Sequence, residues 1–134
     1  MADLYTYTKL SSEDSFRVLE ILPGERDSML CCKIFETRRK DQIKYEAISY
    51  TWGAPIFSHR LTEVTSGTII HITENLYDAL QVFRLEDDSR LLWADAVCID
   101  QSSGAEKVHQ VRPQMGEIYR EAAIALVWLG KEDA

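Results

Sequence analysis

The sequence has few of the residues that mark secreted or metal-binding proteins. Cysteine occurs three times, as Cys31, Cys32 and Cys98, and no pair has the Cys-x-x-Cys spacing. An odd number of cysteines, two of them adjacent, does not predict a disulfide framework and is typical of a reducing compartment. The three histidines are scattered along the chain. We therefore expect neither disulfides nor a metal site.

Long apolar runs and an excess of basic charge are also lacking. No segment reaches the ~18 apolar residues that a membrane-spanning helix needs, and residues 1–10 lack the apolar core of a secretion signal. The formal net charge of −7 argues against binding nucleic acid through its phosphates. The short basic cluster of Arg38, Arg39 and Lys40 is interpreted as a solvated turn. These features predict a cytoplasmic protein that binds neither membranes nor nucleic acid.

What is present indicates one folded domain. The chain has 134 residues, of which 46% are hydrophobic and 28% charged. That length and composition suffice for one apolar core. No linker or internal repeat divides the sequence, so residues 1–134 are predicted to form a single domain in which about residues 1–15 are a flexible arm.

The hydrophobic pattern predicts an α/β fold. Strands are expected at 16–22, 29–35, 45–52, 91–99 and 123–129, with a small hairpin at 62–64 and 68–72. The first two strands are expected to pair as an antiparallel hairpin. One helix carries an apolar face from Leu76 to Phe83, capped by Thr73 or Asn75. A second covers 106–122 and is expected to kink or restart near Arg112 because of Pro113.

Three of these strands are separated by helices, an order that predicts an open, mostly parallel sheet with helices on its faces, as in flavodoxin-like three-layer folds. Ligands of such sheets bind beyond the carboxyl ends of the strands. That rule places three groups of residues on one rim, namely residues 50–53, residues 100–101 and residues 130–131. Candidate substrate-binding residues on or beside this rim are Tyr50, Trp52, Gly53, Asp95, Asp100 and Gln101.

Each candidate has a structural and a functional interpretation. Asp95 lies inside an apolar run, so it either holds neighbouring segments through hydrogen bonds or is a functional carboxylate. Asp100 either caps a turn or binds a ligand. Glu106 either complements the dipole of the helix that it begins or faces the crevice, where a carboxylate can stabilise an oxocarbenium-like transition state. Trp52 and Tyr50 either pack in the core or stack on a flat ring.

The phosphate-binding and nucleophile motifs of common enzyme classes are missing. Neither Gly-x-Gly-x-x-Gly nor Gly-x-x-x-x-Gly-Lys occurs, and Gly-x-Ser-x-Gly is absent too. Classical dinucleotide oxidoreductases, P-loop proteins and serine hydrolases are therefore not indicated.

Several spaced blocks resemble one known family, the fungal heterokaryon incompatibility (HET) domain. The blocks are residues 45–53 (YEAISYTWG), residues 73–80 (TENLYDAL), residues 92–101 (LWADAVCIDQ) and residues 127–130 (VWLG). They occur in the family's order and span nearly the whole chain. The sequence departs from the usual pattern at Thr51, where an aliphatic residue is common, at Asp100, where Asn is frequent, and at Pro113.

The resemblance implies an effector of non-self recognition that triggers regulated cell death. The family is also similar, distantly, to Toll/interleukin-receptor (TIR) domains, many of which cleave NAD+ at the nicotinamide–ribose bond with a glutamate. On this basis Glu106 is the expected catalytic residue, NAD+ the expected substrate rather than a cofactor, and copies of the chain or sensor-domain proteins the expected partners. The alternative is a non-enzymatic module that signals by self-association.

Overall fold

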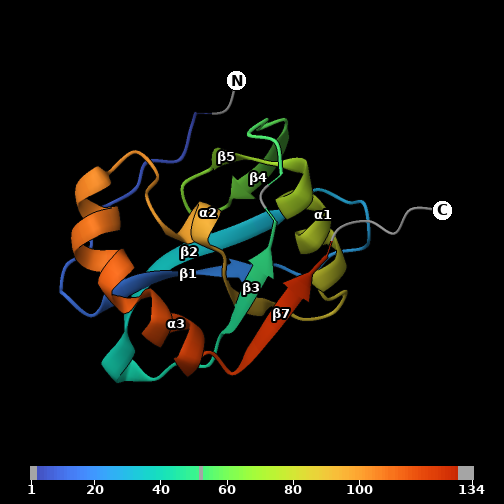
Figure 1. Cartoon of the computed structure of the whole chain (residues 1–134). Helices are drawn as coiled ribbons and strands as arrows, with labels where there is room; N and C mark the ends of the chain where they lie inside the picture. The colour runs from blue at the N-terminus through green and yellow to red at the C-terminus, as the bar shows by residue number, and fades with distance from the viewer. Residues whose placement is uncertain (1–2, 52, 130–134) are drawn as a thin grey trace.

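The computed structural model describes residues 3–51 and 53–129 and has an α/β fold built on one open sheet of seven strands. Their order in the sheet is β5-β4-β2-β1-β6-β3-β7 (Figure 1). The strands are β1 (Ser15–Ile21), β2 (Cys31–Arg38), β3 (Glu46–Tyr50), β4 (His59–Glu63), β5 (Thr68–Ile72), β6 (Arg90–Trp93) and β7 (Ile124–Trp128).

The sheet is mixed, which corrects the expectation of a mostly parallel one. Strand β3 is parallel to β6 and to β7, and β2 is parallel to β4. Strand β1 is antiparallel to both β2 and β6, and β4 is antiparallel to β5. Short connections join β1 to β2 and β4 to β5, and such connections favour antiparallel pairing, whereas parallel neighbours need a long crossover. Only the β3–β6–β7 part of the sheet has the parallel order that the helical connections predict.

Helix α1 (Glu74–Phe83) begins where its cap predicts. The side-chain oxygen of Thr73 accepts a hydrogen bond from the Leu76 backbone N–H at 3.3 Å, so Thr73 rather than Asn75 is the cap. The expected apolar face is formed, with Leu76, Ala79 and Leu80 buried. Phe83 makes an edge-on ring contact with Trp128 of β7, so α1 covers the face of the sheet to which Trp128 points.

The predicted strand at 91–99 is wrong in its second half. Strand β6 ends at Trp93, and residues Asp95–Cys98 form a short helix, α2. A continuous apolar run does not distinguish a buried strand from a buried helix, since both hide all their side chains. Val97 and Cys98 are buried in α2. Asp95 therefore lies in the first turn of a helix beyond the strand end, not inside the sheet.

The second predicted helix is broken, as Pro113 led us to expect. Residues Glu106–Val111 form a π-helical turn, Arg112–Gln114 a 3-10 turn, and Met115–Glu121 the helix α3. Proline lacks the backbone N–H that a continuous helix would need there. Tyr119 of α3 makes an edge-on contact with Trp93, whose side chain lies on the face opposite the one that α1 covers.

The described part of the N-terminal segment runs along one edge of the sheet. The Tyr5 N–H donates to the Ile69 carbonyl at 2.8 Å, and the Ile69 N–H donates to the Asp3 carbonyl at 2.9 Å. Leu10 is buried in the core. Across the described residues, no helix combines the length and apolarity that crossing a membrane requires.

Candidate functional site

The rim beyond β3 and β6 brings an aromatic and an acidic side chain together. Tyr50 ends β3 and is half-buried, and Asp95 opens α2 directly after β6. Burial first, and then the Asp95 carboxylate, raise the pKa of the Tyr50 hydroxyl. The same two causes raise the pKa of Tyr119. The Asp95 carboxylate thus influences two tyrosines, one at the end of β3 and one on α3.

Asp100 and Gln101 stabilise the loop that follows α2. Oδ1 of Asp100 accepts from the Ser102 backbone N–H at 3.1 Å and from the Ser102 hydroxyl at 2.6 Å, which is an Asx turn. The Gln101 amide donates to the carbonyl of Asp95 at 2.8 Å and to that of Ile99 at 3.2 Å. The local contacts of both residues agree with the structural alternative, and the Gln101 amide contacts the backbone of Asp95.

Gly53 is held against the start of α1. It has a φ of 72°, and a Cβ added there would lie 2.7 Å from Nδ2 of Asn75. That amide donates to the Thr51 carbonyl at 2.9 Å, which fastens the end of β3 to α1. Trp52 and Gly130, both placed on the rim by the sequence, lie outside the described residues.

The cavity beside Gly53 is small. It measures about 130 Å³ and is lined by Ala54, Ile56, Ser58, Thr73, Glu74 and Asn75. Sites for small organic molecules usually measure about 300 to 1,000 Å³. The described residues alone therefore do not enclose a full substrate pocket at this part of the rim.

Glu106, the expected catalytic residue, is buried in an ion pair. Its side chain is 6% exposed, and its partner Arg17 on β1 is 3% exposed. The two carboxylate oxygens each accept a hydrogen bond of 2.7 Å from the Arg17 guanidinium. Oε2 also accepts from the Asp100 backbone N–H at 2.7 Å. The carboxylate therefore connects β1 to the loop after α2, and neither oxygen is open to a ligand in this arrangement.

Arg17 was not singled out by the sequence and is the centre of this cluster. It donates to the carbonyl of Cys98 at 3.2 Å and to that of Thr8 at 2.7 Å. Its guanidinium lies 5.0 Å from the ring centroid of Tyr7. Burial alone would lower the pKa of Arg17, but the Glu106 carboxylate reverses this and raises it. An arginine flanked by Phe16 and Val18 in an apolar strand was the available signal, because such a charge needs a buried partner.

The described residues contain no group of three or more His, Cys, Asp or Glu side chains that could hold a metal ion. The three cysteines are free thiols, of which Cys31 is half-buried and the other two are buried.

Comparison with known proteins agrees with the resemblance of the sequence blocks. Residues 45–134 match the family described as heterokaryon incompatibility protein (HET). The chain is also 30% identical over 144 residues to "Heterokaryon incompatibility protein 6, OR allele" of Neurospora crassa (strain ATCC 24698 / 74-OR23-1A / CBS 708.71 / DSM 1257 / FGSC 987). The alignment covers 96% of this chain but 21% of that relative, so the chain spans about a fifth of its length. No solved structure matches.

Proposed function

We propose that this chain, which belongs to the heterokaryon incompatibility (HET) family, acts as an effector in fungal non-self recognition. In this role it triggers regulated cell death. Two observations support this. The family match covers residues 45–134, and a relative named for heterokaryon incompatibility aligns with nearly the whole chain. Sensor-domain proteins and further copies of the chain are the partners that such a role needs.

We propose that this effector hydrolyses NAD+. We also propose that its site is related to those of TIR domains and that its fold has three layers. In this reaction water adds to the ribose carbon as the bond to nicotinamide breaks, and a carboxylate stabilises the positive charge that develops on the sugar. The supporting observation is the gathering of Asp95, Asp100 and Glu106 within one turn and loop after β6. This is the end of the sheet at which open α/β folds bind ligands.

The ion pair sets a condition on this proposal. Glu106 acts on a substrate only after its carboxylate leaves Arg17, since both oxygens are occupied in the described arrangement. We therefore expect the isolated chain to be slow and its activated form to be fast. A change that moves the segment around Tyr7 and Thr8, which holds the other side of Arg17, would release the carboxylate.

The test is to incubate the purified chain with NAD+ over a range of protein concentrations and to measure released nicotinamide by chromatography. Glu106→Gln is compared with Glu117→Gln, which removes an exposed carboxylate of α3. We expect Glu106→Gln to lower the rate by about 100-fold or more and Glu117→Gln to leave it unchanged. Circular dichroism verifies that both variants are folded. Absence of nicotinamide at every concentration would refute the enzymatic proposal, whereas equal rates would refute only the role of Glu106.

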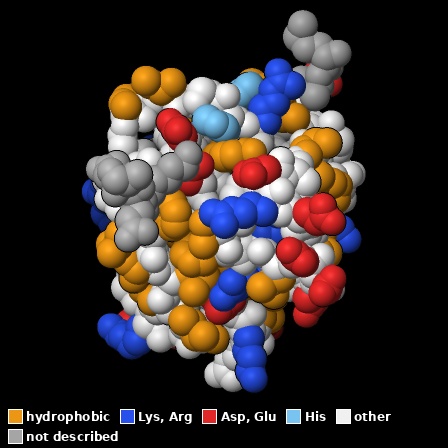
Figure 2. Space-filling model, turned by 90° about the vertical axis from the view of Figure 1, so that its right-hand side faces the viewer, with side chains coloured by type: hydrophobic (Ala, Val, Ile, Leu, Met, Phe, Trp, Pro, Cys, Tyr) orange, Lys and Arg blue, Asp and Glu red, His pale blue; other side chains and the backbone are white. Residues whose placement is uncertain are grey.

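A second candidate function, self-association without catalysis, is favoured by strand β7. This strand ends the sheet and pairs only with β3 within the described residues. Its side chains Ile124 and Val127 are 55% and 58% exposed. Figure 2 shows hydrophobic side chains gathered on the side of the molecule that carries α1 and the end of β7. The opposite edge strand, β5, is covered by the N-terminal segment. An uncovered apolar edge strand is a template for pairing with another chain.

Self-association is tested by sedimentation of Val127→Lys beside Val82→Lys, which places the same charge on an exposed position of α1. A charge on an edge strand opposes edge-to-edge pairing. We expect wild type and Val82→Lys to assemble as concentration rises and Val127→Lys to stay monomeric. A wild-type chain that remains a monomer at every concentration contradicts this second candidate.

A further inference from the structure

Residues 3–9 form a strap that crosses from the edge of the sheet to α2. At the edge, the strap and Ile69 of β5 share two backbone hydrogen bonds of 2.8 and 2.9 Å. At α2, the Tyr7 hydroxyl donates to the Val97 carbonyl at 2.6 Å. The rings of Tyr5 and Tyr7 contact each other edge-on, with 4.9 Å between their centroids. The strap therefore joins β5 to α2.

The strap also covers the ion pair between Arg17 and Glu106. The Thr8 carbonyl accepts a hydrogen bond of 2.7 Å from the Arg17 guanidinium, and the ring of Tyr7 lies over the same guanidinium, with its centroid 5.0 Å away. Arg17 also donates to the Cys98 carbonyl at 3.2 Å, next to the carbonyl of α2 that Tyr7 holds. Arg17 is thus enclosed by the strap, by α2 and by the Glu106 carboxylate.

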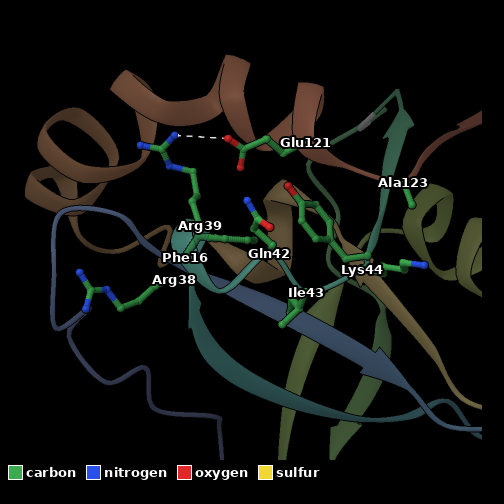
Figure 3. Close-up of a pocket in the computed structure, with 9 residues that line it drawn as sticks. Phe16, Arg38, Arg39, Gln42, Ile43, Lys44, Glu121 and Ala123 are labelled. Carbon is green, nitrogen blue, oxygen red and sulfur yellow. Dashed lines mark ion pairs between the residues drawn. The ribbon is translucent and has the colours of Figure 1, made fainter.

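An arginine–glutamate pair that the strap does not contact shows what the cover changes. Figure 3 shows Arg39 facing Glu121 across a cavity of about 490 Å³. Their charged atoms lie 3.7 Å apart, and their side chains are 29% and 43% exposed. The covered pair of Arg17 and Glu106 is closer, at 2.7 Å, and is almost fully buried. Because water screens the attraction between exposed charges, uncovering Arg17 would weaken its hold on Glu106.

The strap is held more weakly than the elements beneath it. Its exposed members are Asp3, Leu4, Thr6, Thr8 and Lys9. The next residue, Leu10, is buried in the core, and the Ser11 N–H donates to the Glu36 carboxylate at 3.3 Å. Segments with few buried apolar contacts open locally at a lower free-energy cost than the whole domain. Residues 3–9 can therefore detach while the chain stays anchored from Leu10 onward.

We propose that the strap is an autoinhibitory element that keeps the Glu106 carboxylate on Arg17, and that its detachment makes this carboxylate available to a ligand. Detachment removes the Thr8 carbonyl and the Tyr7 ring from Arg17 and lets water reach the guanidinium. The carboxylate then exchanges Arg17 for water or for a ligand. What the released carboxylate does rests on the function proposed above, whereas the release itself is measurable without a substrate.

The test is amide hydrogen exchange, followed by NMR on the full chain labelled with nitrogen-15. The Asp100 N–H donates to Oε2 of Glu106 at 2.7 Å, so its exchange rate reports whether the carboxylate is in place. The Arg84 N–H donates to the Leu80 carbonyl at the end of α1 at 2.9 Å and reports on opening elsewhere in the domain.

Three variants separate the contacts of the strap. Tyr7→Ala removes both the hydroxyl and the ring, Tyr7→Phe removes the hydroxyl alone, and Thr6→Ala is the control because it shortens an exposed side chain of the strap. We expect Tyr7→Ala to speed exchange at Asp100 by at least about tenfold, Tyr7→Phe to speed it less, and Thr6→Ala to leave it unchanged. Exchange at Arg84 is expected to stay constant. Unchanged exchange at Asp100 in Tyr7→Ala, or equal acceleration at Asp100 and Arg84, would overturn the proposal.

Nicotinamide release by the same variants distinguishes the strap from the chemistry. If NAD+ is the substrate, Tyr7→Ala is expected to release nicotinamide at least about tenfold faster than wild type. Faster exchange at Asp100 with no nicotinamide from any variant would support release by the strap and refute the hydrolysis. Faster exchange with nicotinamide release no faster than in wild type would overturn the strap as a control of this site.

Discussion

Replacing Glu106 by alanine is expected to destabilise the fold strongly, because it leaves the Arg17 charge buried without its partner. Arg17 is 3% exposed and would lose both hydrogen bonds of 2.7 Å from its guanidinium to the carboxylate. Breaking a buried ion pair by deleting one partner costs about 3 to 5 kcal/mol. The orphaned Asp100 N–H adds about 1 kcal/mol or more. Since domains of this kind are stable by about 5 to 15 kcal/mol, Glu106→Ala is expected to be marginally folded.

The assay is urea unfolding followed by tryptophan fluorescence, with Trp93 as a fully buried reporter. The control is Glu117→Ala, which breaks an ion pair to Arg120 whose side chains are 39% and 72% exposed. Exposed pairs contribute about 0 to 1 kcal/mol, so this variant is expected to unfold near the wild-type midpoint.

A double-mutant cycle separates the ion pair from other effects of the substitutions. Arg17→Met with Glu106→Leu replaces both charges by apolar groups of similar size. We expect the double variant to lose less stability than the sum of its single variants, by at least about 1 kcal/mol, since residues in direct contact are coupled. If Glu106→Ala costs less than about 1 kcal/mol, or if the single effects add, the carboxylate is not the structural partner of Arg17 that its contacts indicate.

Three further outcomes follow from local geometry. Cys98 is buried, and burial raises the pKa of its thiol to about 12. We therefore expect iodoacetamide at pH 8 to label the half-buried Cys31 of the folded chain but not Cys98. Mass spectrometry identifies the labelled residue. In the unfolded chain the Cys98 thiol loses its proton near pH 9, whereas in the folded chain burial keeps it protonated to higher pH. The thiol therefore has no effect on the free energy of unfolding below pH 9 and lowers it as the pH rises toward 12. Urea unfolding midpoints measured across this pH range test the expectation. Gly53→Ala and Gly67→Ala both place a Cβ at a φ near 70°, a cost of about 1 to 2 kcal/mol. Only at Gly53 does the new atom also lie 2.7 Å from Asn75, so equal calorimetric losses would contradict that close approach.

Local patterns predicted most of the elements well. The apolar spacing of α1 and the Thr73 cap need only neighbouring residues, and the structure confirms both. Pro113 predicted the break near Arg112 for an equally local reason, the missing backbone N–H. The run 91–99 failed because its residues are apolar on every side, so periodicity carried no information. Its division into β6 and α2 depends on what packs around Val97 and Cys98.

Motifs and periodicity along the chain were enough to indicate the family, the α/β class and the polar residues that follow β6. The environment of Glu106, in contrast, depends on how distant segments pack. Its partner Arg17 is 89 positions away in sequence, and no local pattern encodes which buried charges will meet. The same holds for the cavity of about 490 Å³ whose lining brings Phe16 of β1 together with Ala123, which precedes β7. Burial and charge pairing are properties of segments brought together in space, and they determine what each carboxylate and cation can do.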